Sequence, residues 1–525
     1  MKRFLELLVL MTMVLSCSKE GSAGSGSGAV MPDDDYSLSH GMIVLGEKLE
    51  NPYTTDNVQR AYTSIYPTRS RTDIETTDLY VRFLPEDSDD LELLLRKGVD
   101  LVDHPVDYEI VTDGDYYHDP EIAEDKITWQ YAVVPKDFVF PDVKYEVLDE
   151  CFIADGDVTT RSGETIDWDA LEAESFRLTG NEDMLVPEMK GKKVYPSGRI
   201  TIVDEDVNGG KPFGVAGVRV RCNVFVKFAS TYTDRDGYYK IPKKYSSKVR
   251  YRLVFKNSKG FAIGFNLIIV QASTSSLGRR SPEGYSTTVT RKSESKLFKR
   301  CVVNNAAYDY ITRCSAEDMN LTPPPSDLRI WLFPGLSASS AVMIHHGAVV
   351  DNSIISNFLG IFSSIIKFFA PDITIGTNGL SSYRELYSTV CHELAHASHF
   401  AKAGKKYWDK YIKFILTSFI TSGGTTYGSG SEPDAGYCEV GEMWAYYLES
   451  MMYKERYGGA VPSFGTSYWF RPQIFRYLDE RGISRSDILN VLTSDVTDRN
   501  VLENRLLSKY PEKATVIGQA FNRYN

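Results

Sequence analysis

Hydrophobic and polar positions change their period along the chain, and this change divides the sequence into regions of different secondary structure. Between residues 39 and 154, short apolar runs alternate with acidic turns. Residues 79–84 alternate as a strand does, residues 90–98 have the pattern of a short helix ended by glycine, and residues 99–110 return to strand-like alternation. This order predicts a small α+β module that contains a β-α-β segment.

A polar stretch, 155–194, follows this module and carries clusters of glycine and acidic residues, so it is predicted to be a linker. The region 195–270 then alternates again. Residues 198–203 and 217–221 have strand patterns, and residues 233–241 place a tight turn before a further strand. These short strands predict a β-sandwich.

The turn sequence from Thr233 to Ile241 reads T-x-x-D-G-Y-Y-x-I. It resembles the carboxypeptidase-regulatory-like, transthyretin-like β-sandwich domains of exported bacterial proteins, over about seventy residues. The resemblance implies a rigid spacer or a presentation module. We interpret Asp234 and Asp236 as turn residues, with calcium binding as the alternative.

From residue 295 to 525 the pattern becomes mainly helical. Residues 354–369 are strongly apolar but contain Asn357 and Lys367 and are too few to span a bilayer, so they are predicted to form a buried helix. Residues 372–376 are predicted to be a short strand. The fold class is therefore multidomain: an N-terminal α+β module, a β-sandwich and a C-terminal, mainly helical α+β domain.

The N-terminus has the features of an export signal. Lys2 and Arg3 precede an apolar run of about a dozen residues, which is signal-peptide length. The following Val-Leu-Ser-Cys, ending at Cys17, resembles the lipobox of bacterial lipoproteins. This implies a signal peptide over residues 1–16, acylation of Cys17 and anchoring to the outer membrane. An uncleaved anchor, or a secretory signal with an incidental cysteine, is the alternative.

A flexible tether is expected at 17–38, because residues 21–28 are all Gly, Ser or Ala. The acidic run 33–35 resembles surface-export signals of some Gram-negative lipoproteins, so periplasmic and outward-facing locations in the cell envelope both stay open. Export also makes disulfides possible. Six cysteines remain beyond Cys17, and they either pair or stay free and buried.

Composition excludes several classes of function. The chain has 525 residues, 59 Lys and Arg against 70 Asp and Glu, and a net charge of −11, so no general nucleic-acid footprint is present. Aromatic residues make up 12%, which excludes wholesale disorder. No nucleic-acid partner is expected.

The candidate chemistry lies in residues 391–399, which contain the motif H-E-x-x-H. Ser382 and Glu385 have the spacing of a capping box, which predicts that the motif lies well inside a helix. His392 and His396 are then one turn apart on one face and can share one Zn²⁺. Glu393 is offset by one residue and can reach a water in the open coordination position as general base.

The third ligand is sought downstream. The metzincin pattern requires a glycine and a histidine where this chain has His399 and Lys402, so that pattern is absent. His399 is expected to be a supporting or surface residue. Residues 442–445 read E-x-x-A, which looks like the second active-site helix of gluzincin metallopeptidases; Glu439 is the rival ligand.

This gluzincin resemblance covers about eighty residues and implies that His392, His396 and Glu442 bind one zinc ion while Glu393 is catalytic. Glu449 is expected to be solvated. A disulfide between Cys391 and Cys438 would clamp the two helices. The strand at 372–376 resembles the zincin edge strand, along which a peptide substrate pairs.

An oxyanion-stabilising residue is also needed, and the sequence leaves several candidates open: Tyr446, Tyr447, Tyr468 and the pair His345 and His346. The glycine-rich stretch 422–430 is either a mobile rim or an ordinary loop.

The sequence thus predicts an exported, lipid-anchored zinc metallopeptidase that hydrolyses peptide bonds in a peptide or protein substrate. Residues 295–525 form its zincin-like domain. The alternative is a surface binding or adhesion lipoprotein whose zincin-like domain is structural or inactive.

Overall fold

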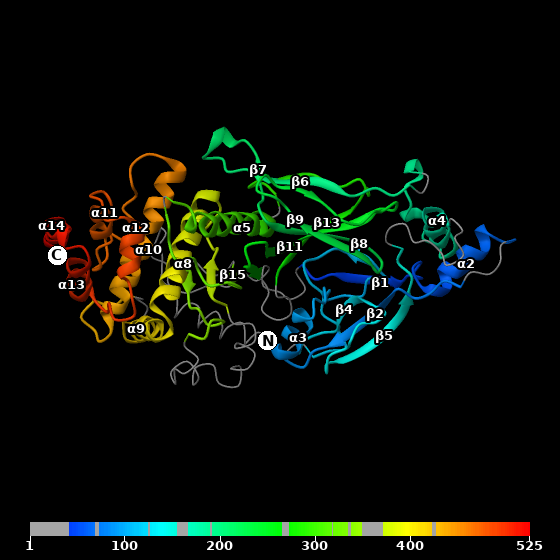
Figure 1. Cartoon of the computed structure of the whole chain (residues 1–525), viewed down its shortest axis with the longest axis horizontal. Helices are drawn as coiled ribbons and strands as arrows, with labels where there is room; N and C mark the ends of the chain where they lie inside the picture. The colour runs from blue at the N-terminus through cyan, green and yellow to red at the C-terminus, as the bar shows by residue number, and fades with distance from the viewer. Residues whose placement is uncertain are drawn as a thin grey trace.

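The computed structural model describes residues 41–68, 73–123, 126–154, 166–189, 192–264, 272–293, 295–317, 319–333, 338–348, 371–422 and 427–524. The predicted signal peptide, Cys17, the tether and the apolar stretch 354–369 lie outside these residues. The described chain is rich in β-strands in its N-terminal part and helical in its C-terminal part (Figure 1). This agrees with the multidomain α+β expectation.

The N-terminal module contains two small antiparallel sheets. In one, β1 (Val44–Lys48) pairs with β3 (Tyr108–Thr112); in the other, β2 (Asp78–Leu84) lies between β4 (Gln130–Pro135) and β5 (Lys144–Cys151). The predicted strand at 79–84 is confirmed as β2. The predicted helix is confirmed as α3 (Ser88–Arg96), with Gly98 at φ +78° two residues beyond its end.

The predicted β-α-β segment is wrong. β2 and β3 belong to different sheets, and only the end of the stretch 99–110 is a strand. The alternation of apolar residues there has another cause: Val99 and Val102 pack into the interior from an irregular segment that joins α3 to β3.

The predicted linker at 155–194 contains a helix, α4 (Trp168–Leu178), capped by the Asp167 side chain. α4 packs against α2 (Thr55–Ile65). Glu172 of α4 is buried and forms ion pairs with Lys193 and Lys227 at 2.9 and 3.0 Å. The sequence analysis missed this helix because the segment is polar. Its buried face includes Glu172, whose charge is neutralised by lysines that are distant in the sequence.

The β-rich centre of the chain consists of two sheets whose inward apolar residues share one core. The first sheet contains the strands β6 (Ser197–Ile202), β7 (Phe213–Gly214), β10 (Tyr238–Lys240) and β14 (Thr287–Val289). The second sheet includes the strands β8 (Val218–Val224), β9 (Lys227–Tyr232), β11 (Val249–Asn257) and β13 (Thr274–Arg280). Both sheets continue past residue 270, where the sequence places the end of the sandwich.

The turn before β10 has the predicted structure. Asp234 Oδ1 accepts hydrogen bonds from the backbone N–H groups of Asp236 and Tyr238, each at 2.9 Å. Gly237 has φ +84°, and a Cβ there would lie 2.1 Å from the Ile200 carbonyl oxygen. The aspartate therefore stabilises a turn that only glycine fits.

The second sheet extends into the C-terminal part of the chain. β12 (Ala262–Gly264) pairs with β11 and with β15 (Arg329–Phe333); β17 (Ile373–Gly376) pairs with β15 and with β16 (Ser340–Ala341). The predicted strand at 372–376 is confirmed as β17, but its edge position is wrong. β17 is an interior strand, so its backbone is already paired on both sides, and β16 is the edge of the sheet.

Helices make up most of the remaining chain. α5 (Ser295–Cys314) lies beside the central sheets, and the other helices lie towards the end of the molecule opposite α2 and α4 (Figure 1). The bounds of these other helices are α8 (Tyr383–Ala403), α9 (Lys405–Ser422), α10 (Ala435–Tyr457), α11 (Gln473–Asp479), α12 (Arg485–Val491), α13 (Arg499–Lys509) and α14 (Ala514–Arg523). Among the described residues, none of the helices combines the length and the apolar character needed to cross a membrane.

Candidate metal centre

Helix α8 carries the H-E-x-x-H motif. The capping box at its start is confirmed: Ser382 Oγ accepts from the Glu385 N–H, and the Glu385 carboxylate accepts from the Ser382 N–H. The helix is buried almost from end to end. The motif therefore lies in the interior of the protein on a rigid element.

Helix α10 supplies the acidic partner from across the interface. The Trp444 indole N–H donates to the Ala395 carbonyl oxygen of α8 at 3.0 Å, which fixes the two helices against each other. On its other side α10 contacts α9 at Gly441, where a Cβ would lie 3.2 Å from the Tyr411 ring. The small residue lets α9 approach and brings the Tyr411 hydroxyl to the cluster.

Three side chains converge at this place. The Nε2 atoms of His392 and His396 lie 3.2 Å apart, and each lies 3.5 Å from a carboxylate oxygen of Glu442. All three residues are buried. A tetrahedral zinc ion with bonds of about 2.0–2.1 Å separates its ligand atoms by about 3.3–3.4 Å. The separation of the two Nε2 atoms is close to that spacing, and each of the two Glu442 oxygens lies nearest to a different histidine. With one ligand atom from each residue, the three atoms lie within 4.8 Å of one another, so these residues could hold a metal ion.

Electrostatics support the pairing of the carboxylate with the imidazoles. Burial alone would lower the pKa of His392, but its contacts with Glu442 and with Glu449 outweigh burial and raise the pKa to about 10. Burial would raise the pKa of Glu442, but the two histidines lower it below its usual range. Burial lowers the pKa of His396. A fully buried carboxylate is therefore kept ionised beside two imidazole nitrogens.

Glu449 is the largest departure from the sequence-based expectation. It is fully buried rather than solvated, and its Oε2 lies 3.1 Å from His392 Nδ1. Its other oxygen accepts a hydrogen bond from the Ser388 hydroxyl. With Nδ1–H donated to this carboxylate, Nε2 is the nitrogen of His392 that faces the cluster, the arrangement typical of metal-binding histidines.

Two tyrosines that the sequence analysis did not single out also contact the third ligand. The Tyr411 hydroxyl donates to Glu442 Oε1 at 2.6 Å, and the Tyr427 hydroxyl donates to Oε2 at 3.4 Å. Tyr411 belongs to α9, which lies between the two halves of the motif along the chain. With 33 tyrosines in the chain, no local pattern distinguishes these two.

The two other acidic residues considered in the sequence analysis, Glu393 and Glu439, have different surroundings. Glu393 lies on α8 beside His392 and is 1% exposed. Glu439, the rival ligand, points away from the cluster and forms an ion pair with Arg499 at 3.2 Å. Among the described residues, the group able to hold a metal ion contains Glu442 and excludes Glu439.

His399 is not a surface residue. It is fully buried between the rings of Tyr407 and Trp408, with ring centroids 4.9 and 5.7 Å away. Burial lowers its pKa to about 3, so the ring is neutral. It lies outside the group of three ligands, and its surroundings are aromatic, so its role here is packing beneath the cluster.

The oxyanion candidates are reduced in number by their contacts. The Tyr446 ring packs on His392 with centroids 4.4 Å apart, whereas Tyr447 packs on Phe475. His346 is committed to structure, because its Nδ1 lies 2.9 Å from Asp372 and its Nε2 lies 2.9 Å from the Ser326 carbonyl oxygen. Tyr446 is therefore the candidate that we place next to the cluster.

The proposed Cys391–Cys438 disulfide is absent. Both cysteines are buried free thiols, as are the other four in the described residues. Burial raises the pKa of both thiols. The helices are held together by packing and by the Trp444 hydrogen bond instead.

Comparison with known proteins gives no relative: no family model, no curated protein and no solved structure matches this chain.

Proposed function

We propose that this protein is a zinc-dependent metallopeptidase, in which His392, His396 and Glu442 bind one zinc ion and Glu393 is the general base. The observation that carries the proposal is the convergence of three buried side chains, whose ligand atoms all lie within 4.8 Å of one another. It is supported by the 3.2 Å separation of the two histidine Nε2 atoms, which is close to zinc ligand spacing, together with a carboxylate next to the first histidine. We assign the helical region as the zincin-like domain and the two central sheets as the carboxypeptidase-regulatory-like module.

The roles of the residues follow from their contacts. A bound zinc ion supplies a Lewis acid that polarises a carbonyl and makes water more acidic. Glu449 holds the proton of His392 on Nδ1, and Tyr411 holds the Glu442 carboxylate in place by donating its hydroxyl proton to Oε1. Glu393 follows His392 on α8 and interacts electrostatically with it, and its carboxylate would accept the proton of the attacking water.

The test separates binding from chemistry. Glu393→Gln keeps the shape of the side chain and removes the base, so it should retain one zinc per chain and lose peptide hydrolysis by at least about 100-fold. Glu442→Ala should lose zinc. Activity is measured on a quenched fluorescent peptide mixture, with zinc quantified by atomic emission. Full hydrolysis by Glu393→Gln would exclude the proposed mechanism.

A structural metal site is the second candidate, and one observation favours it: His392, His396 and Glu442 are at most 4% exposed. This agrees with the alternative of a binding or adhesion protein with an inactive zincin-like domain. This alternative would be supported if the protein bound zinc tightly, if zinc raised its melting temperature, and if the protein hydrolysed no member of the peptide mixture.

For location, we propose export to the cell envelope with lipid attachment at Cys17 to the outer membrane. The lipobox-like sequence supports this proposal. Cells expressing the full chain are fed an alkyne-labelled fatty acid. The parent should incorporate the label and Cys17→Ser should not; equal labelling of both would contradict lipidation at this residue.

A further inference from the structure

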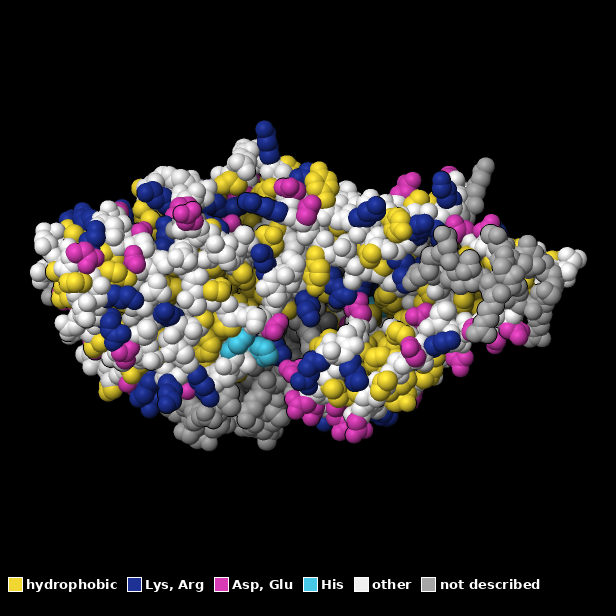
Figure 2. Space-filling model, in the orientation of Figure 1, with side chains coloured by type: hydrophobic (Ala, Val, Ile, Leu, Met, Phe, Trp, Pro, Cys, Tyr) yellow, Lys and Arg dark blue, Asp and Glu magenta, His cyan; other side chains and the backbone are white. Residues whose placement is uncertain are grey.

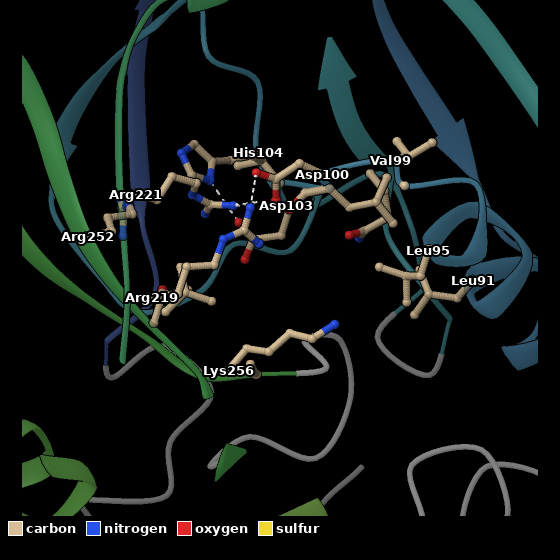
Figure 3. A pocket seen from close by; sticks show the side chains of 17 residues that line it. Leu91, Leu95, Val99, Asp100, Asp103, His104, Arg219, Arg221, Arg252 and Lys256 are labelled. Atoms are coloured by element: carbon tan, nitrogen blue, oxygen red, sulfur yellow. Dashed lines mark hydrogen bonds and ion pairs between the residues drawn. The ribbon is translucent and has the colours of Figure 1, made fainter. Parts of the chain in front are cut away.

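A cavity of about 230 Å³ lies far from the metal centre, where the N-terminal module meets the second central sheet. One wall is the irregular segment after α3, from Gly98 to His104, and the opposite wall is the sheet face of β8 and β11 (Figure 3). Figure 2 shows Lys and Arg side chains along this junction. Nothing in the proposed peptidase chemistry uses the cavity.

Strand register places the basic residues on one face. Arg221 of β8 is the direct partner of Arg252 of β11, and Arg219 is the partner of Val254. Residues two apart on a strand share a face, so Arg219, Arg221, Arg252 and Lys256 all line the cavity. The alternate residues of these strands point into the apolar core instead.

These charges are costly to bury, and they are only partly compensated. Arg221 and Arg252 are 6% and 3% exposed. Four basic side chains line the cavity against two carboxylates, those of Asp100 and Asp103. Burial and the neighbouring arginines lower the pKa of Arg221. Arg221 and Arg252 are direct partners on neighbouring strands, and two buried guanidinium groups this close together need anions nearby to offset the cost of burying their charges.

The donors of Arg221 are the best-placed for a ligand. Its Nη1 donates to the Leu101 carbonyl oxygen at 3.3 Å and lies 3.5 Å from Asp100. Its Nε and Nη2 have no partner among the described residues. Lys256, at the rim, has no ion pair within the described part of the chain. Arg219 is taken by Asp100, and Arg252 is taken by Asp113 and the Gly114 carbonyl oxygen.

Acidic groups on the opposite wall do not neutralise this excess. Asp103 accepts from the Tyr117 N–H at 2.7 Å and lies 2.7 Å from His104 Nδ1. Burial lowers the pKa of His104, so this ring adds no charge. Asp100 is shared between Arg219 and Arg221. The Nε and Nη2 donors of Arg221 and the ammonium group of Lys256 therefore belong to side chains that line the same cavity.

Gln130 and Thr274 also line the cavity, but much of the remaining lining is apolar and sets the size and shape of a ligand. Leu91 and Leu95 come from α3, and Val99, Val102 and Val254 surround the basic cluster. The cavity is smaller than the roughly 300–1,000 Å³ of pockets for drug-sized ligands. It suits a small molecule with one charged end and a short apolar body.

We propose that this cavity binds a small organic acid, with its carboxylate on Arg221 and Lys256 and its apolar chain against Leu95 and Val99. The planar guanidinium fork matches a carboxylate geometrically, and the ammonium of Lys256 adds a point charge at the entrance. The acid is either a free carboxylic acid or the carboxyl-terminal residue of a peptide, which share this chemistry.

The experiment is calorimetric titration of the full chain with four probes: hexanoate, N-acetyl-leucine, hexanol and inorganic phosphate. Hexanoate should bind with one site, and hexanol should not, because it lacks the charge. Saturable binding of N-acetyl-leucine tighter than hexanoate assigns the peptide terminus as the source; the reverse order assigns the free acid. Binding of phosphate alone, or equal binding of hexanol, would overturn the proposal.

Two variants locate the site. Lys256→Met removes no ion pair present in the described residues, so folding should be unaffected, and affinity should fall about threefold. Arg221→Met removes the buried fork, and affinity should fall at least about tenfold. Lys211→Met, an exposed lysine outside the cavity, is the matched control and should bind hexanoate as the parent does. Unchanged affinity in Lys256→Met and Arg221→Met would overturn the assignment.

Discussion

Replacement of Glu449 by glutamine should weaken zinc binding although the residue does not contact the metal. The Glu449 carboxylate is fully buried, lies 3.1 Å from His392 Nδ1 and accepts from Ser388. Glutamine keeps the volume and one acceptor but removes the negative charge that polarises the imidazole. Loss of such a supporting carboxylate costs about 10–100-fold in metal affinity, which corresponds to about 1.4–2.8 kcal/mol.

Glu449→Ala should have a larger effect. It leaves His392 Nδ1–H and the Ser388 hydroxyl without their acceptor in a buried place, and each such group costs about 1–3 kcal/mol. The dissociation constant of zinc is measured by competition with a chromogenic chelator, and unfolding is followed by circular dichroism.

Glu455→Gln is the control for this experiment. Glu455 is on the same helix and forms ion pairs with Arg313 and with Arg485, so its replacement should lower stability but leave zinc affinity within about twofold. If Glu449→Gln bound zinc as tightly as the parent does, the argument that Glu449 orients His392 would be refuted.

Further predictions test other parts of the structure. Tyr411→Phe removes a donor to Glu442 and should weaken zinc binding by about fivefold in the chelator competition; unchanged affinity would contradict a role in holding the ligand. Glu439→Gln should bind zinc normally, since Glu439 pairs with Arg499. Two lysines outweigh burial and lower the pKa of Glu172 to about 2. A lowered pKa stabilises the fold above the unfolded value near 4.5, so Glu172→Gln should lose about 3 kcal/mol at pH 7 in urea unfolding, and the deficit should shrink as the pH falls from 4.5 towards 2. A pH-independent difference would contradict this linkage.

Local patterns predicted the helix of the motif well. The capping box at Ser382 and the apolar spacing after it locate the start of α8, because both signals act within a few residues of the chain. Glu442 follows from the E-x-x-A pattern, although its separation from His396 is longer than in many gluzincins. These residues converge because α8 and α10 are long helices that pack against each other.

Residues whose environment is set by distant segments could not be predicted. Glu449 has the pattern of a solvated residue on α10, yet α8 covers it and supplies both Ser388 and His392. The same reason explains the missed helix α4, whose Glu172 is neutralised by Lys227 from the central sheet. The edge position given to β17 failed because the pairing of β16 depends on a two-residue strand that has no sequence signal.

The sequence also did not predict that the arginines of β8 and β11 form a candidate binding site. Each of Arg219, Arg221 and Arg252 reads as the polar half of an alternating strand, with the outer face in water. The N-terminal module covers that face, and only the register of β8 against β11 brings Arg221 and Arg252 together. Because the N-terminal module covers this sheet face, side chains that the sequence pattern places in water line a cavity instead.

Anomalous diffraction at the zinc absorption edge, from crystals of the zinc-loaded protein, tests the central claim most directly. We expect one peak per chain within about 2.0–2.2 Å of His392 Nε2, His396 Nε2 and a Glu442 carboxylate oxygen, with Glu393 beside it and not bound to it. A peak elsewhere, or a peak at this place coordinated by Glu393 in place of Glu442, would contradict the account.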